Sequence, residues 1–158
     1  MSDRLPMTRT GFETLRERLN KLKTTDRREV SREIEIARGH GDLRENADYD
    51  AAKNKQGMIE ANIRDLEDKL ARAEVIDVAS LTGDKVLFGA TVTISDTKSG
   101  AEQTVQIVGE VEADTKNAKI SVTSPLARAL VGKHVGDTVK AQTPGGAREY
   151  EIIDVVFQ

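Results

Sequence analysis

The first half of the chain repeats apolar side chains at the spacing of amphipathic helices. One seam, with steps of three and four residues, consists of Phe12, Leu15, Leu19, Leu22, Asp26, Val30, Ile34 and Ala37. Three successive steps of four, beginning at Leu22, make one stutter in its heptad pattern. A second seam alternates steps of three and four through Tyr49, Ala52, Gln56, Ile59, Ile63, Leu66, Leu70 and Ala73. The spacing predicts two long helices.

The two seams match as the two sides of one hairpin. Residue numbers of opposing positions add to 85 for Phe12 with Ala73 and to 86 for Ala37 with Tyr49. Gly39 and Gly41 between the seams favour a helix end and a reversal. The pattern predicts an antiparallel two-helix coiled coil folded about residues 42–43, an arm about 45 Å long at about 1.5 Å per residue. An ordinary bundle, with both helices packed on the second half, is the alternative.

The second half changes to an alternating pattern typical of strands. The strands are expected at residues 85–88, 90–94, 104–108, 119–122, 137–141 and 148–157. One short helix is expected over residues 126–131, with Ser124 as N-cap and Pro125 at the first helical position. The prediction is an α+β fold: a coiled-coil arm over residues 1–78, and a small antiparallel sheet with one helix over residues 79–158.

Composition narrows the function classes. The 158 residues carry 24 Lys and Arg against 27 Asp and Glu, contain no Cys, and are 3% aromatic. A disulfide scaffold and a Cys-ligated metal site are excluded. The net charge of −3 and the lack of Trp argue against tight direct binding of nucleic acid. Because neither a membrane-length apolar run nor a secretory signal is present, we expect a soluble cytoplasmic protein without a membrane partner.

The predicted turn carries the best candidate for chemistry. Asp42 and Glu45 are carboxylates three residues apart, which could bind a hard divalent cation and orient a water. As a site for Mg²⁺ they would be incomplete without ligands from another molecule. The same Asp-x-x-Glu pattern is a capping box, with Asp42 as N-cap and Glu45 as N3 of the second helix. Leu43 at an exposed turn fits capping less easily, and both interpretations remain open.

Basic residues along the arm are a second candidate. The set consists of Lys21, Lys23, Arg27, Arg28, Arg32, Arg38, Lys53 and Lys55. They form either a solvated coiled-coil face or a surface for phosphates, with Arg38 and Lys53 nearest the turn. His40, beside the turn, is expected to be a bystander.

The residues over 37–49, ARGHGDLRENADY, resemble the tip motif of the bacterial Gre transcript cleavage factors. The resemblance covers the whole chain, and the acidic composition is closer to the GreA branch than to the more basic GreB branch. Further matching segments lie at residues 6–8, 73–77, 88–92, 121–128 and 143–146.

The resemblance implies a coiled coil followed by a domain similar to the FK506-binding-protein fold. It also implies a monomer that is not itself an enzyme. The globular domain would dock on the rim of the RNA polymerase secondary channel, and Ser124, Pro125 and Leu126 are the candidate docking residues. The arm would enter the channel and stimulate the polymerase's own endonucleolytic cleavage of the 3′ end of backtracked RNA.

The same resemblance assigns roles at the tip. Asp42 and Glu45 would complete the coordination of a second Mg²⁺, shared with the polymerase active site, and position the attacking water. The isolated protein would hold no metal or other cofactor of its own. Leu43 and Tyr49 would shape the tip.

Arg38 and Lys53 would contact the extruded RNA. Two residues depart from the family pattern. Gly39 replaces a larger residue and is expected to loosen the last helical turn. Lys53 stands where Arg is frequent, so it offers a single ammonium charge instead of the two-point hydrogen bonding of a guanidinium group.

Two other functions remain as alternatives. A channel-binding relative could inhibit the polymerase, although the retained acid pair argues against it. A peptidyl-prolyl isomerase or chaperone is suggested by the fold of the second half. Its aromatics are just Phe88, Tyr150 and Phe157, too few for an aromatic-lined proline pocket.

Overall fold

The structure is a computed structural model that describes residues 4–41, 46–78 and 81–157. Its contacts divide the chain into two compact units, residues 12–72 and residues 1–11 with 73–158. These limits differ from the expected boundary after residue 78, because β1 (Leu5–Thr8) pairs in parallel with β2 (Ala73–Ile76). The strands on either side of the arm therefore belong to the globular unit.

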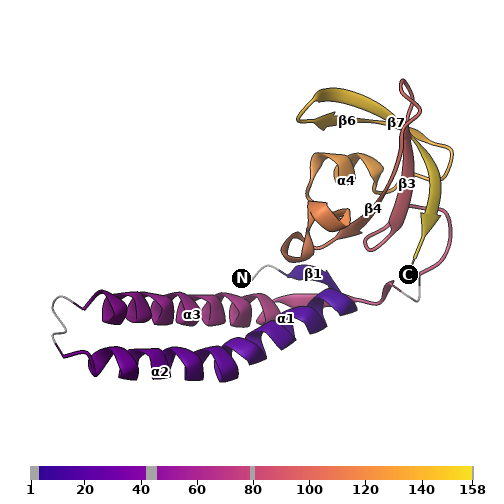
Figure 1. Cartoon of the computed structure of the whole chain (residues 1–158). Coiled ribbons are helices and arrows are strands. Elements are labelled where there is room, and N and C mark those ends of the chain that lie inside the picture. The colour runs from indigo at the N-terminus through magenta and orange to yellow at the C-terminus, as the bar shows by residue number, and fades with distance from the viewer. Residues whose placement is uncertain (1–3, 42–45, 79–80, 158) are drawn as a thin grey trace. The chain divides into compact units, whose positions relative to one another are not determined.

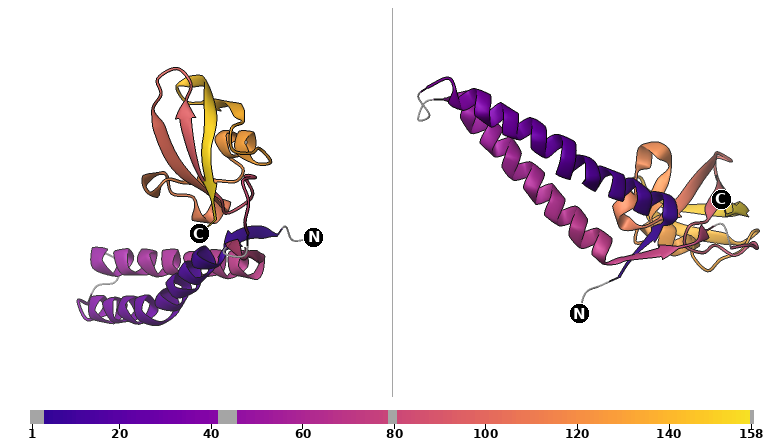
Figure 2. Two further views of the ribbon diagram at one scale, coloured as in Figure 1. Left: turned by 90° about the vertical axis from the view of Figure 1, so that its right-hand side faces the viewer. Right: turned by 90° about the horizontal axis from the view of Figure 1, so that it is seen from below.

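The arm is a hairpin of helices (Figure 1). Its first side comprises α1 (Arg9–Lys21), a π-helical segment η1 (Leu22–Asp26) and α2 (Arg27–Arg38), and its second side is α3 (Ala47–Ala71). Two further views show the two sides running next to each other (Figure 2). The predicted helical hairpin is confirmed.

The hairpin is held by the predicted apolar seams. Leu22, Val30, Ile59, Ile63 and Leu66 form a buried cluster, and the partly buried Leu15 and Leu19 pack against it. The stutter in the first seam coincides with the π-helical segment that begins at Leu22. A π turn adds residues to one turn of helix, so it absorbs the extra spacing and keeps the seam on the inner face.

The globular unit contains a five-stranded sheet with the order β5-β4-β3-β7-β6. Its strands are β3 (Thr91–Asp96), β4 (Glu102–Val108), β5 (Lys119–Ser121), β6 (Thr138–Thr143) and β7 (Gly146–Val156). The 3-10 helices η3 (Glu110–Glu112) and η4 (Thr115–Asn117) lie between β4 and β5, and α4 (Pro125–Leu130) lies between β5 and β6. The unit's core includes Val92, Ile94, Ile107, Leu130 and Ile152, each at most 1% exposed.

Two sequence expectations about this unit need correction, and one pairing was missed. The sheet is mixed rather than antiparallel, because β5 pairs with β4 in parallel. Residues 85–88 are not a strand: Lys85 makes an isolated bridge to His134, and the Val86 amide donates to the Lys133 carbonyl in a loop contact. The β1–β2 pair was not predicted. The α+β class and the short helix after Ser124 are confirmed.

Strand β1 is also tied to η3 through one carboxylate. Glu112 accepts hydrogen bonds from the Thr8 amide and hydroxyl and, at 3.0 Å, from the Gly109 amide. A Cβ atom on Gly109 would lie 2.0 Å from the Pro6 carbonyl oxygen, so glycine is required for this close approach.

No helix in the described part of the chain is long and apolar enough to cross a membrane.

Candidate functional site

The tip of the arm lies between the end of α2 and the start of α3. Gly39 caps α2 with a right-handed helical backbone, and its amide donates to the carbonyl of Ile36 at 3.0 Å. Gly41 has a φ of 100°, a left-handed conformation that favours glycine. Asp42, Leu43 and Glu45 lie outside the described residues.

Helix α3 begins with an asparagine cap. Asn46 has an extended backbone, and its Oδ1 accepts a hydrogen bond from the Tyr49 amide at 3.0 Å. The capping interpretation of Asp42 and Glu45 is therefore wrong, since both residues precede the N-cap of α3. Asp42 and Glu45 have the spacing of a capping box, but Asn46, four positions after Asp42, supplies the cap.

Asn46 also joins the two sides of the tip. Its Nδ2 donates to the carbonyl oxygen of Ala37 in the last turn of α2. Asn46 is 8% exposed and Ala37 is 2% exposed, so this hydrogen bond is shielded from water. Sequence analysis did not single out Asn46, although Asn followed by a helical run is a typical cap signal.

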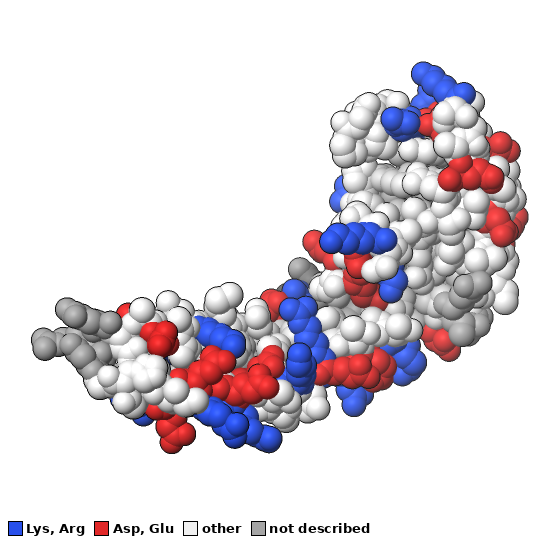
Figure 3. All heavy atoms as spheres, in the orientation of Figure 1, with Lys and Arg blue, Asp and Glu red and all other residues white. Residues whose placement is uncertain are grey.

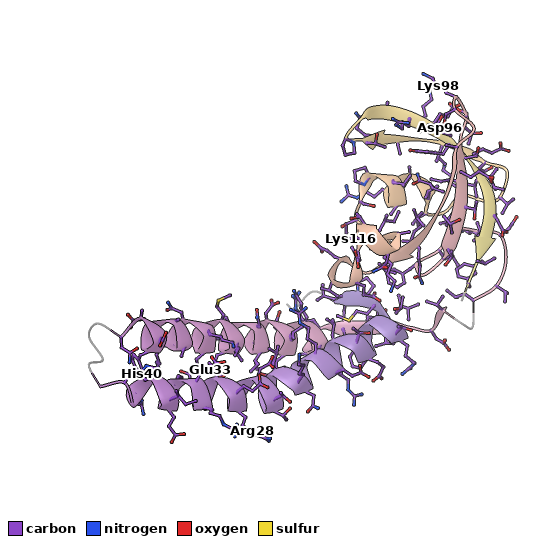
Figure 4. All side chains as sticks on the ribbon, in the orientation of Figure 1. Arg28, Glu33, His40, Asp96, Lys98 and Lys116 are labelled. Carbon is purple, nitrogen blue, oxygen red and sulfur yellow. The ribbon has the colours of Figure 1, made fainter. Side chains whose placement is uncertain are left out.

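Two further residues of the tip lie on opposite sides of the turn. The His40 Nδ1 and Asp48 Oδ2 atoms are 3.4 Å apart, and both side chains are more than half exposed. Figure 4 shows Glu33 of α2 and His40, which follows α2, between the two sides of the hairpin. Tyr49 is half-buried, in the first turn of α3.

The structure brings Arg38 and Lys53 together. Both line one groove of about 350 Å³ on the arm, together with Ser31, Ile34, Glu35 and Gln56. The Lys53 Nζ donates to the Gln56 Oε1 at 3.0 Å. Within the described ranges, no carboxylate lies within ion-pair distance of either cation. The described carboxylates therefore neutralise neither cation.

Other members of the basic set are neutralised within the arm. Lys23 pairs with Glu67, Arg27 with Glu60, and Lys55 with Glu33, each pair bridging the two sides of the hairpin. Hydrogen bonding to Glu33 raises the pKa of Lys55. In Figure 3, basic and acidic side chains are interleaved on the visible face of the arm. Lys55 is therefore engaged in an ion pair, whereas Lys53, two positions earlier, is not paired with any described carboxylate.

The docking candidates sit at the start of α4. The Ser124 Oγ donates to the Ser121 carbonyl at 2.7 Å and accepts from the Ala127 amide at 3.3 Å. Leu126 packs against the globular core, and Pro125 is exposed at the first helical position. Ser124 and Leu126 thus have structural contacts, and Pro125 presents the accessible surface of the three.

The tip has the chemistry of a partial site. No group of three or more His, Asp or Glu residues within the described ranges could hold a metal ion. Asp42 and Glu45 would add at most two carboxylates, and hard cations of the Mg²⁺ type need about six oxygen ligands. The described residues of the tip therefore do not form a metal site by themselves.

Comparisons with known proteins cover both units. The family described as transcription elongation factor, N-terminal, matches residues 5–75, and transcription elongation factor, GreA/GreB, C-term, matches residues 81–157. The chain is 56% identical to transcription elongation factor GreA of Hyphomonas neptunium over 99% of both chains. It is 52% identical to GreA of Trichlorobacter lovleyi over the full length of both. A solved structure, GreA factor homolog 1 of Thermus thermophilus, is 30% identical, covers 97% of this chain and 99% of its own, and has a TM-score of 0.44.

Proposed function

Because the chain belongs to the GreA/GreB family of transcription elongation factors, we propose that it stimulates RNA polymerase to cleave backtracked RNA from within the secondary channel. The observation that carries this assignment is the position of the helix cap. Since Asn46 caps α3, Asp42 and Glu45 have no capping role there. Two acidic residues in the turn of a long hairpin are suited to reach a buried active centre.

In the proposed mechanism the polymerase performs the chemistry. Two-metal phosphoryl transfer requires a second Mg²⁺ and an oriented water. Asp42 and Glu45 would complete the ligand set of that ion and orient the water, so the factor would contribute to a nuclease activity that belongs to the polymerase. Mg²⁺ is thus shared, and the work takes place in the bacterial cytoplasm.

The remaining tip residues hold the substrate and the arm. Arg38 and Lys53, with no carboxylate partner in the described part of the chain, contact the phosphates of the extruded RNA 3′ end. Leu43 and Tyr49 shape the tip. The globular unit docks on the channel rim, with Pro125 as the accessible member of the α4 candidates.

The test is RNA cleavage in stalled, backtracked polymerase complexes. We expect Asp42→Asn and Glu45→Gln each to reduce the maximal cleavage rate at least 100-fold, with the competition affinity for polymerase unchanged. Asp50→Asn is the matched control, since Asp50 is an exposed acid in the first turn of α3. Full cleavage by both tip variants would refute the proposal. Slower RNA synthesis without cleavage by the wild-type chain would favour the inhibitor alternative.

A further inference from the structure

The side-chain amide of Asn46 makes hydrogen bonds through both its oxygen and its nitrogen at the base of the tip, where α2 ends and α3 begins. The Asn46 Oδ1 accepts from the Tyr49 amide, and its Nδ2 donates to the Ala37 carbonyl. The Ala37 carbonyl also accepts from the His40 amide at 3.1 Å, so both of its lone pairs are engaged. One side chain therefore links the last turn of α2 to the first turn of α3.

Capping alone does not account for asparagine at this position. Asp, Ser and Asn cap helices about equally well, because each supplies an oxygen to a free amide. Elsewhere in this chain Asp114 and Ser124 act as caps. An aspartate at position 46 would keep the bond from Tyr49 but would lose the donor to Ala37, and a serine is too short to span both. Asparagine supplies a donor and an acceptor at once.

Burial makes the cross-link rigid. Asn46 is one of three buried polar residues in the described part of the chain, and it lies beside the buried Ala37. A buried amide that lost its partner would carry the full desolvation penalty, so opening the base of the tip is costly. The last turn of α2 and the first turn of α3 are therefore held at a fixed separation.

We propose that Asn46 is a positioning residue for the Asp42 and Glu45 pair, through its hydrogen bond to the Ala37 carbonyl. The inference rests on the proposed function, because it assumes that the pair takes part in cleavage. Misplacement of reacting groups by about 1 Å can reduce a rate about 100-fold, so a widened base would lower the maximal rate without weakening docking.

Two variants separate the cross-link from the cap. Asn46→Asp and Asn46→Ser both keep a good cap and both remove the donor to Ala37; the first adds a charge and the second does not. We expect each to lower the maximal cleavage rate about 10- to 100-fold and to raise the Mg²⁺ concentration for half-maximal rate. The factor concentration for half-maximal cleavage and the helical circular dichroism signal should stay at wild-type values.

Controls identify the cause of any loss. Asn62→Asp makes the same chemical change at an exposed position of α3 and should leave all four quantities unchanged. Wild-type maximal rates for both Asn46 variants would overturn the proposal, as would a loss of rate that is matched by weaker polymerase binding or lower helix content. Inert Asn46 variants beside an inactive Asp42→Asn would leave the proposed function standing, whereas a fully active Asp42→Asn would overturn both.

Discussion

Arg27 and Glu60 join the two sides of the arm through a two-point contact. The Arg27 Nε lies 3.0 Å from Glu60 Oε1, and its Nη2 lies 2.9 Å from Oε2. Arg27 is the first residue of α2 after the π-helical segment, where the helix changes its winding. The two parallel hydrogen bonds between guanidinium and carboxylate hold α2 in register with α3, next to the π-helical segment where the backbone hydrogen bonds of the first side are irregular.

The Arg27–Glu60 pair makes the arm sensitive to acid. The hydrogen bond from Arg27 lowers the pKa of Glu60, so the stabilisation is complete above the ordinary glutamate pKa and is lost as pH falls through the lowered pKa. We expect Glu60→Gln to lower the melting temperature at pH 7, with a difference from wild type that shrinks below about pH 4. Circular dichroism at 222 nm measures it. Glu35→Gln, at an exposed α2 position, is the control, and a pH-independent difference would contradict the prediction.

The two glycines of the tip should respond oppositely to the same substitution. Gly39 has a φ of −67°, which any residue adopts, and an added Cβ would lie 3.2 Å from the Ile36 carbonyl oxygen, a tight contact that a shift of a few tenths of an ångström at the helix end would relieve. Gly41 has open space around it but a φ of 100°. We expect Gly39→Ala to stabilise the arm by about 0.4–1 kcal/mol, and Gly41→Ala to destabilise it by about 1 kcal/mol. Urea unfolding measures both changes, and equal signs would refute this account of the tip.

Gly39→Ala also tests whether this residue loosens the tip. The described backbone at Gly39 is already helical, so alanine would keep its conformation and reduce the entropy of the unfolded chain. We expect unchanged cleavage stimulation in the backtracked-complex assay. A faster maximal rate would instead show that Gly39 reduces the rigidity that cleavage requires.

The basic groove should act on RNA rather than on docking. Arg38→Ala and Lys53→Ala each remove a cation that faces the same groove, so we expect the maximal cleavage rate to fall about 3- to 10-fold, as for loss of one phosphate contact. Binding of the factor to polymerase without backtracked RNA should be unchanged.

Matched controls for the groove come from the arm itself. Arg28→Ala removes an exposed cation that points away from α3 in Figure 4, and Lys55→Ala removes one that is paired with Glu33. Neither should change the cleavage rate. If all four variants lowered it equally, the effect would come from the net charge of the arm and not from a groove that binds RNA.

The sequence predicted the parts of the fold that repeat over many residues. The two seams identified the hairpin because each buried position is reinforced by neighbours one turn away, from Leu22 to Leu66. The parallel pair of β1 and β2 was missed, since each strand has four residues and their partners lie far apart in the chain, as Thr8 and Ile76 do. No local pattern signals such a pairing.

The candidate site was predicted less completely, for a related reason. Motif spacing pointed to Asp42 and Glu45 but could not choose between a cap and a metal ligand. The start of α3 at Ala47, with Asn46 as its cap, excludes the cap and leaves the metal-ligand role as a prediction. The cross-link to Ala37 depends on tertiary packing that spacing does not reveal. The roles of the acid pair, the basic groove and the α4 residues stay predictions until cleavage is measured.

The parallel pairing of β1 with β2 has a consequence for how the chain folds. The pairing closes a loop that runs from Thr8 to Ala73, and closing a flexible loop of this length would cost about 3.5 kcal/mol in entropy. The two sides of the hairpin pack on each other inside that loop, so a hairpin formed first would bring the ends of the loop together before the strands meet. We infer that the arm folds first and that its assembly lowers the entropic barrier for the pairing of β1 with β2.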